Sequence, residues 1–185
     1  MTSAEQQLFE LLKTRSFQRG TFRLASGGTS DYYIDGRLTA VYSEAAYLIG
    51  EIIYDRTHEL RLGAIGGLAV GAVPLTTAAV IAYHRHGRPM EGFWVRSQAK
   101  AHGTQKLVEG ALKPGARVAI VEDVITQGNS SLQAIEEVRK LKCEVAVVLA
   151  LVDRLQGAKK LLADAGIANF RSVFTIRDFG VSVPD

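Results

Sequence analysis

The chain contains a single cysteine, Cys143, so no disulfide can form within it, and its cysteine content gives no sign of secretion. No apolar run approaches the roughly 18 residues that a helix needs to cross a bilayer. The first residues lack the basic start and apolar stretch of a signal peptide, and their pattern is that of an amphipathic helix. We therefore expect a cytoplasmic protein in which Cys143 has a structural role.

Basic residues are neither abundant nor grouped. Lys and Arg number 22 against 19 Asp and Glu, which gives a formal net charge of +3 with His neutral. Without a basic stripe the sequence gives no sign of binding nucleic acid, whereas a small anionic substrate fits the mild positive bias. No repeat, low-complexity segment or linker divides the 185 residues, and 47% of them are hydrophobic. This length and composition suit one domain spanning residues 1–185.

Apolar periodicity predicts helices and strands that alternate along most of the chain. Helices are expected over residues 4–16, 43–59, 73–85, 129–142 and 157–166. Strands are expected over residues 90–96, 117–122, 144–153 and 170–176, with one more before a glycine-rich bend at 66–75. Such alternation predicts an α/β fold, with a central, mainly parallel sheet flanked by helices. The start of the chain breaks the alternation, so residues 1–40 are expected to form a small N-terminal hood.

The stretch from Val118 to Ser130 reads VAIVEDVITQGNS, in which an apolar strand runs into two acids, a short loop and a helix. Free N–H groups at the start of that helix would bind an anion, and Gly128 would let the backbone approach it closely. Carboxylates accept hydrogen bonds from sugar hydroxyls or hold Mg²⁺ through water. Glu122 and Asp123 therefore predict a ligand with hydroxyls at one end and phosphate at the other.

This motif resembles the phosphoribosyl-diphosphate signature of the type I phosphoribosyltransferases. The resemblance implies that Glu122 and Asp123 hold the ribose hydroxyls of 5-phospho-α-D-ribose 1-diphosphate (PRPP), while the following loop surrounds its 5′-phosphate. The PRPP-binding residues expected from the signature are Glu122, Asp123, Val124, Ile125, Thr126, Gln127, Gly128, Asn129 and Ser130.

The segment FWVRSQAKAHGTQKLVEG is similar to the mobile catalytic loop of one branch of that family, the orotate phosphoribosyltransferases. Arg96, Lys100 and His102 could place three donors on a leaving diphosphate, and Gly103 could act as a hinge. A cationic lid of this kind neutralises developing charge and excludes water. The resemblance makes Arg96, Lys100 and His102 the expected catalytic residues, which also contact PRPP.

Two further segments resemble the same branch. LASGGTSDYYIDGR is similar to its N-terminal ligand hairpin, which would bring Tyr33 and Ile34 to the pyrimidine ring. LVDRLQGA matches the family pattern after the long strand, and it implies that Arg154 pairs with the orotate carboxylate, a group that suits a guanidinium fork. A salt bridge to a neighbouring acid is the alternative for Arg154. Thr126 completes the expected orotate site, and GGLAVGAVPL looks like the loop that binds diphosphate.

The sequence departs from the family pattern at three positions. Ser97 stands where most relatives have lysine, so one cation of the lid is missing. Gly71 and Ala25 also occupy positions that are lysine in many bacterial members. Lys106 is a possible substitute for the missing cation at position 97.

The resemblance implies the transfer of ribose 5-phosphate from PRPP to orotate, which yields orotidine 5′-monophosphate and diphosphate in de novo UMP biosynthesis. It also implies Mg²⁺ held mainly by diphosphate and water, with no direct protein ligand, and a homodimer in which the lid of one subunit closes over the site of the other. Membrane and nucleic-acid partners are not expected. Two alternatives are open, namely a relative that uses another base and a regulator that binds the sugar phosphate without catalysis.

Overall fold

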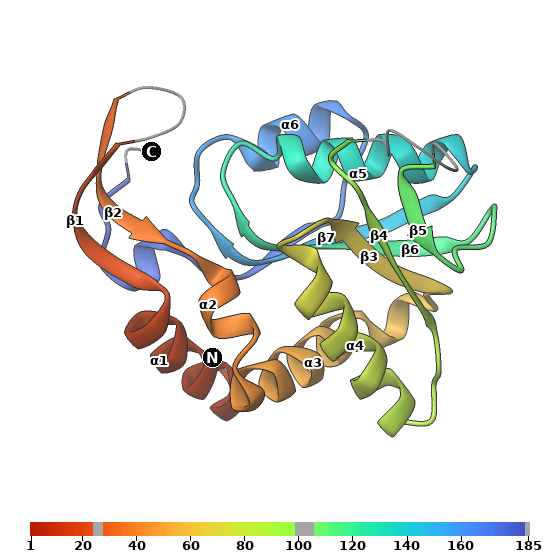
Figure 1. Cartoon of the computed structure of the whole chain (residues 1–185), viewed down its shortest axis with the longest axis horizontal. Coiled ribbons are helices and arrows are strands. Elements are labelled where there is room, and N and C mark those ends of the chain that lie inside the picture. The colour runs from red at the N-terminus through yellow and green to blue at the C-terminus, as the bar shows by residue number, and fades with distance from the viewer. Residues whose placement is uncertain (24–27, 99–105, 184–185) are drawn as a thin grey trace.

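A six-stranded sheet lies at the centre of the computed structural model, which describes residues 1–23, 28–98 and 106–183 (Figure 1). The strand order is β5-β4-β3-β6-β7-β8, and every neighbouring pair is parallel except β4 and β5. The prediction of a mainly parallel α/β fold is thus confirmed. The strands are β3 (Ala64–Leu68), β4 (Glu91–Val95), β5 (Val108–Gly110), β6 (Arg117–Ile125), β7 (Glu144–Asp153) and β8 (Phe170–Thr175).

Helices cover both faces of this sheet. Figure 1 shows α3 (Ser43–Thr57) and α4 (Ala72–Arg85) on one face, with α5 (Asn129–Lys140) and α6 (Ala158–Asp164) on the other. Alternate residues of a strand point to opposite faces, so Val121 packs in the core beneath α3 and α4 while Ile120 packs beneath α5. Strands β6 and β7 are buried on both sides for this reason, which explains their continuous apolar sequence.

The N-terminal segment lies against one end of the central sheet and contributes no strand to it. It comprises α1 (Ser3–Arg15), an antiparallel hairpin of β1 (Phe17–Arg23) and β2 (Thr29–Ile34), and the short helix α2 (Gly36–Ala40). An ion pair of 2.5 Å between Glu5 and Arg56 joins α1 to α3. Phe9 and Phe17 pack against Phe179 of the 3₁₀ turn η2 (Ile176–Phe179), with ring centroids 4.9 and 5.2 Å apart. These contacts hold the hairpin beside the carboxyl ends of the central strands.

Several element boundaries differ from the prediction. Strand β6 does not end at Glu122 but continues to Ile125, because Val124 and Ile125 pair with Val152 and Asp153 of β7. Helix α3 ends at Thr57 and is followed by the 3₁₀ turn η1 (His58–Leu60). Neither α2 nor β5 was predicted, because both are very short and depend on tertiary contacts. Among the described helices, none combines the length and apolar character required to cross a membrane.

Candidate active site

Two adjacent acids lie inside strand β6, near its carboxyl end. Glu122 and Asp123 are only 7% and 9% exposed. Burial, reinforced by the nearby charge of Asp123, raises the pKa of Glu122 to about 8. Burial also raises the pKa of Asp123. The pair therefore holds a proton at neutral pH, and it can offer both acceptors and a donor to the hydroxyls of a ligand.

Glycines on two other elements leave room for these acids. A β-carbon added at Gly71, the N-cap of α4, would lie 2.4 Å from Asp123 Oδ1. One added at Gly36, the first residue of α2, would lie 2.9 Å from Asp123 Cβ and 3.0 Å from its Oδ2. Because real β-carbons do not approach so closely, the Asp123 carboxylate can keep this position only between residues without side chains. This packing gives a physical reason for Gly71 where many relatives have lysine.

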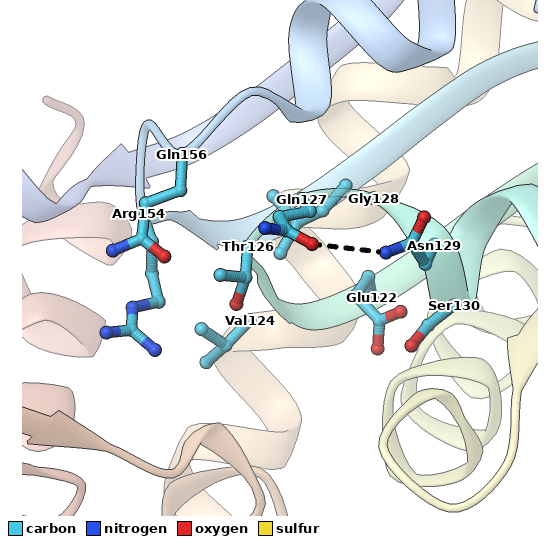
Figure 2. A pocket seen from close by; sticks show the side chains of 10 residues that line it. Glu122, Val124, Thr126, Gln127, Gly128, Asn129, Ser130, Arg154 and Gln156 are labelled. Carbon is cyan, nitrogen blue, oxygen red and sulfur yellow. Dashed lines mark hydrogen bonds between the residues drawn. The ribbon is translucent and has the colours of Figure 1, made fainter. Parts of the chain in front are cut away.

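The loop after β6 lines a cavity of about 310 Å³, shown in Figure 2. Gly128 has a φ of 91°, a conformation that glycine adopts without strain, and it forms the N-cap of α5. The side-chain amide of Asn129 donates a hydrogen bond of 3.3 Å to Gln127 Oε1. The lining comprises Glu122, Val124, Ile125, Thr126, Gln127, Gly128, Asn129, Ser130, Arg154 and Gln156. A helix N-terminus on the wall of this cavity is suited to bind a phosphate.

A second hollow of about 280 Å³ adjoins the first and shares Glu122, Val124, Thr126, Ser130 and Arg154 with it. Tyr33 and Ile34 from β2 and Asp123 from β6 also lie on its wall. Residues predicted from the sequence for a sugar phosphate and for a pyrimidine thus meet at one site. Figure 2 shows Arg154 at one end of the lining and Glu122 and Ser130 at the other.

Sequence reasoning missed three residues of this wall. Asp35 and Arg37 line the second hollow and form a two-bond ion pair, with Arg37 Nε 2.8 Å from Asp35 Oδ1 and Arg37 Nη2 2.7 Å from Asp35 Oδ2. The Arg37 hydrogen bonds lower the pKa of Asp35. Both residues belong to the hairpin motif, so that motif was the available signal. Gln156 lies two residues beyond Arg154 on the wall of the first cavity, and its type alone gave no signal.

Arg154 follows the last residue of β7, and its backbone N–H donates a hydrogen bond of 2.9 Å to the Ile125 carbonyl. Its guanidinium Nε donates to the hydroxyl of Tyr32 over 3.0 Å. Among the described residues no acid forms a salt bridge with Arg154. In this part of the chain the alternative of a structural salt bridge therefore has no partner, and the guanidinium faces the cavity.

Of the three expected catalytic residues, the described structure includes Arg96 alone. Lys100 and His102, as well as Gly103 and Ala25, lie outside the described residues. Arg96 does not line either cavity. Its Nη1 lies 3.7 Å from Glu109 Oε1, and its Nε donates to the Gln98 carbonyl over 3.3 Å. Ser97 is exposed, and its carbonyl accepts a hydrogen bond of 3.1 Å from Gln133 on α5.

Comparisons with known proteins find relatives that cover nearly the whole chain. No protein-family model matches the chain. Orotate phosphoribosyltransferase of Rhodopirellula baltica is 40% identical over 180 residues, which cover 94% of this chain and 93% of the relative. The crystal structure of the Mycobacterium tuberculosis H37Rv orotate phosphoribosyltransferase with Fe(III) dicitrate is 39% identical, covers 96% of this chain and 99% of that one, and superposes with a TM-score of 0.85. A second structure of that enzyme, in complex with PRPP, is similar with a TM-score of 0.80, 35% identity and coverage of 96% and 99%.

Proposed function

This chain belongs to the orotate phosphoribosyltransferase family, and we propose that it carries out the family's reaction with the residues gathered around the β6–α5 turn. It is a pentosyltransferase that transfers ribose 5-phosphate from PRPP to orotate, giving orotidine 5′-monophosphate and diphosphate in pyrimidine biosynthesis. The single observation that carries the assignment of residues is the meeting of a buried acid pair, a helix N-terminus and the Arg154 guanidinium on one continuous wall.

The sugar phosphate is held from both ends. The ribose hydroxyls bind Glu122 and Asp123, while the 5′-phosphate binds the N–H groups at the start of α5, with Thr126 and Ser130 beside them. Such binding fixes the anomeric carbon relative to the base, which converts an encounter of two substrates into a reaction within one complex. No protein nucleophile is required, because N1 of orotate attacks the anomeric carbon as diphosphate leaves.

The departing diphosphate carries the largest developing charge. Arg96, Lys100 and His102 are the expected donors to it when the lid closes, and this role is a prediction from the sequence. Mg²⁺ bound to the diphosphate would neutralise part of its charge. The described residues contain no group of three or more His, Cys, Asp or Glu that could hold a metal, and burial raises the pKa values of Glu122 and Asp123. In this proposal Mg²⁺ is held mainly by diphosphate and water, and the acids act on the ribose hydroxyls.

The base lies between the hairpin and Arg154. Tyr33 and Ile34 contact the ring, Thr126 lies beside it, and the guanidinium of Arg154 pairs with the orotate carboxylate. A planar fork of donors matches a carboxylate in both shape and charge. Residues 1–40 act as the hood that brings the hairpin to this end of the site. We assign the enzyme to the cytoplasm, as its composition predicts.

The protein acts as a homodimer in this proposal, and an apolar surface supports that assembly. A hollow of about 470 Å³ lies between α2, α3 and α4, and its lining includes Val41, Tyr47 and Ile81, which are 70%, 52% and 55% exposed. Exposed apolar residues gathered in one place are typical of protein interfaces. Light scattering after gel filtration should give the mass of a dimer, and Ile81→Asp should shift it toward that of the monomer.

The reaction is tested directly by following the absorbance of orotate in the presence of PRPP and Mg²⁺. Consumption of orotate that depends on both additions is expected, and a panel of other bases should react far more slowly. Absence of turnover with tight PRPP binding would favour a non-catalytic sugar-phosphate sensor instead.

Lid sharing is tested by mixing two strongly impaired variants, Lys100→Ala and Asp123→Asn. If the lid acts across the interface, subunit exchange should restore about a quarter of wild-type activity, because half of the dimers are mixed and each of these has one intact site. If the lid acts within its own subunit, every site keeps one defect and activity stays low.

A further inference from the structure

Tyr32 holds the arginine that faces the base, although it lies outside the cavity itself. It is 5% exposed and lines neither of the two adjoining hollows of the active site. Its hydroxyl accepts a hydrogen bond of 3.0 Å from Arg154 Nε, across a separation of 122 residues in the sequence. The guanidinium carbon of Arg154 also lies 4.7 Å from the centre of the Tyr32 ring, in cation–π contact.

The Tyr32 ring is itself fixed by contacts with other aromatic rings. The ring of Phe17 on β1 stacks on that of Tyr32 with centroids 6.0 Å apart and planes inclined by 27°. Phe17 in turn packs against Phe179, with centroids 5.2 Å apart. A chain of rings thus connects the C-terminal part of the described structure to the Arg154 side chain. Because Tyr32 is buried and cannot easily change rotamer, it restricts a side chain that is otherwise long and flexible.

The bond to Nε decides which edge of the guanidinium is available. A carboxylate can pair with an arginine either along the edge made by Nε and one terminal nitrogen, or along the edge made by the two terminal nitrogens. Tyr32 occupies Nε, and within the described residues the guanidinium forms no other hydrogen bond. The edge with two terminal nitrogens is therefore left for a ligand in the cavity.

We propose that Tyr32 is a positioning residue for base selection, which fixes Arg154 so that its two terminal nitrogens receive the carboxylate of the substrate base. This inference rests on the proposed pairing of Arg154 with that carboxylate. Without the Tyr32 hydroxyl the Arg154 guanidinium can rotate. Binding of a carboxylate must then also order this side chain, which lowers the affinity. Ligands without the carboxylate gain nothing from Arg154 and are not affected by its freedom.

The test compares two nucleotides that differ only in the carboxylate, orotidine 5′-monophosphate and uridine 5′-monophosphate. Binding of each is measured by calorimetry to the wild type, Tyr32→Phe and Arg154→Gln. Tyr32→Phe should weaken binding of orotidine 5′-monophosphate by about five- to tenfold, as expected for the loss of one typical hydrogen bond, and should leave binding of uridine 5′-monophosphate within about twofold. In catalysis the same variant should raise KM for orotate while kcat stays within about twofold.

Tyr83→Phe is the matched control, since Tyr83 is also buried and its hydroxyl lies 2.8 Å from that of Thr57, away from both cavities. It should lose a comparable hydrogen bond without changing the preference between the two nucleotides. Equal weakening of both nucleotides by Tyr32→Phe would show a merely structural role and overturn the proposal.

The double variant of Tyr32→Phe and Arg154→Gln, compared with the single variants, distinguishes failure of the proposed base site from failure of the positioning role of Tyr32. Tyr32→Phe should have no further effect on nucleotide preference once Arg154→Gln is present, because its effect acts through the arginine. If Arg154→Gln alone leaves the preference unchanged, the proposed base site fails. If Arg154→Gln removes the preference but Tyr32→Phe does not reduce it, only the positioning role of Tyr32 fails.

Discussion

The two ends of the active site are assembled in different ways. The end that faces the sugar phosphate comes from one continuous stretch, residues 122–130, which forms the end of β6, a loop and the start of α5. The end that faces the base combines Tyr33 and Ile34 of the N-terminal hairpin with Arg154 after β7. The charged residues of the first end are the acids Glu122 and Asp123, which are buried from solvent. A partly buried cation held by an aromatic ring dominates the second.

Because of this difference, the geometry of each end of the active site depends on different contacts of the fold. The residues of the first end follow one another along the chain, so their relative positions need no docking of the hairpin, although β6 itself pairs with β3 and β7. A site made from distant segments depends on how the hairpin docks against the sheet. We therefore expect substitutions at the first end to change affinity for the sugar donor whatever the base, and substitutions at the second end to change the choice of base.

The largest effect is expected from Asp123→Asn, which keeps the size of the side chain but removes a charged acceptor. Loss of charge-assisted hydrogen bonds to the ribose should lower kcat/KM by about 100-fold. The preference for orotidine over uridine 5′-monophosphate should survive, since Arg154 is untouched. Steady-state kinetics and calorimetry check both statements, and a loss of nucleotide preference would contradict the independence of the two ends.

Gly71→Ala should have the next largest effect, because its methyl group would lie 2.4 Å from Asp123 Oδ1 and force the carboxylate to move. We expect KM for PRPP to rise by about tenfold, from the loss of one well-placed hydrogen bond to a charged group. Gly63→Ala is the control, since its β-carbon would meet only ordinary contacts of 3.7 Å. Unchanged KM values in Gly71→Ala would mean that the Asp123 position is not restricted by this glycine.

Glu122→Gln tests whether burial of the acids changes how the stability of the folded protein depends on pH. The pKa of Glu122 is raised from 4.5 to about 8 in the folded protein, so folding favours its protonated form. Wild-type stability should then fall as pH rises from about 4.5 through 8, because the folded state must lose a proton that it binds more tightly than the unfolded state. The glutamine variant lacks this penalty.

Its melting temperature should therefore exceed that of the wild type by roughly 10 °C at high pH and come close to it near pH 5, given about 1.4 kcal/mol for each tenfold change in proton affinity and about 2–4 °C for each kcal/mol in a domain of this size. Calorimetry of the ligand-free protein at a series of pH values measures the difference. The exposed Glu10→Gln is the control and should give no such trend. A difference that does not depend on pH would show that Glu122 is charged throughout.

The smallest effect is expected from Ser97→Lys, which restores a cation of the lid. A cation about 4 Å from a phosphate contributes roughly 4 kcal/mol at an effective dielectric of 20, but solvent screening and desolvation reduce this strongly at an exposed position. We expect turnover to be preserved or raised by less than about fivefold, with no change in nucleotide preference. The exposed neighbour Gln98→Lys provides the control. A clear loss of turnover would mean that the lid works differently in this chain.

The sequence by itself determined the alternation of elements, the mainly parallel sheet and the position of the β6–α5 turn. These features follow from local patterns: apolar runs for strands buried on both faces, helical periodicity, and a glycine that permits a positive φ at residue 128. The same stretch predicted that the acids precede a loop and the start of a helix, because a strand, loop and helix that follow one another leave little freedom. Its pattern did not reveal that β6 continues past the acids, since that pairing depends on β7.

Only the tertiary structure decided the base end and the environment of the acids. Nothing in the neighbourhood of Tyr32 in the sequence indicates that its hydroxyl receives the Arg154 guanidinium, because the two residues meet only when the hairpin docks beside β7. The raised pKa of Glu122 likewise depends on burial by residues from several elements. Local interactions are encoded by neighbours along the chain, whereas desolvation and long-range contacts exist only once distant segments have packed together.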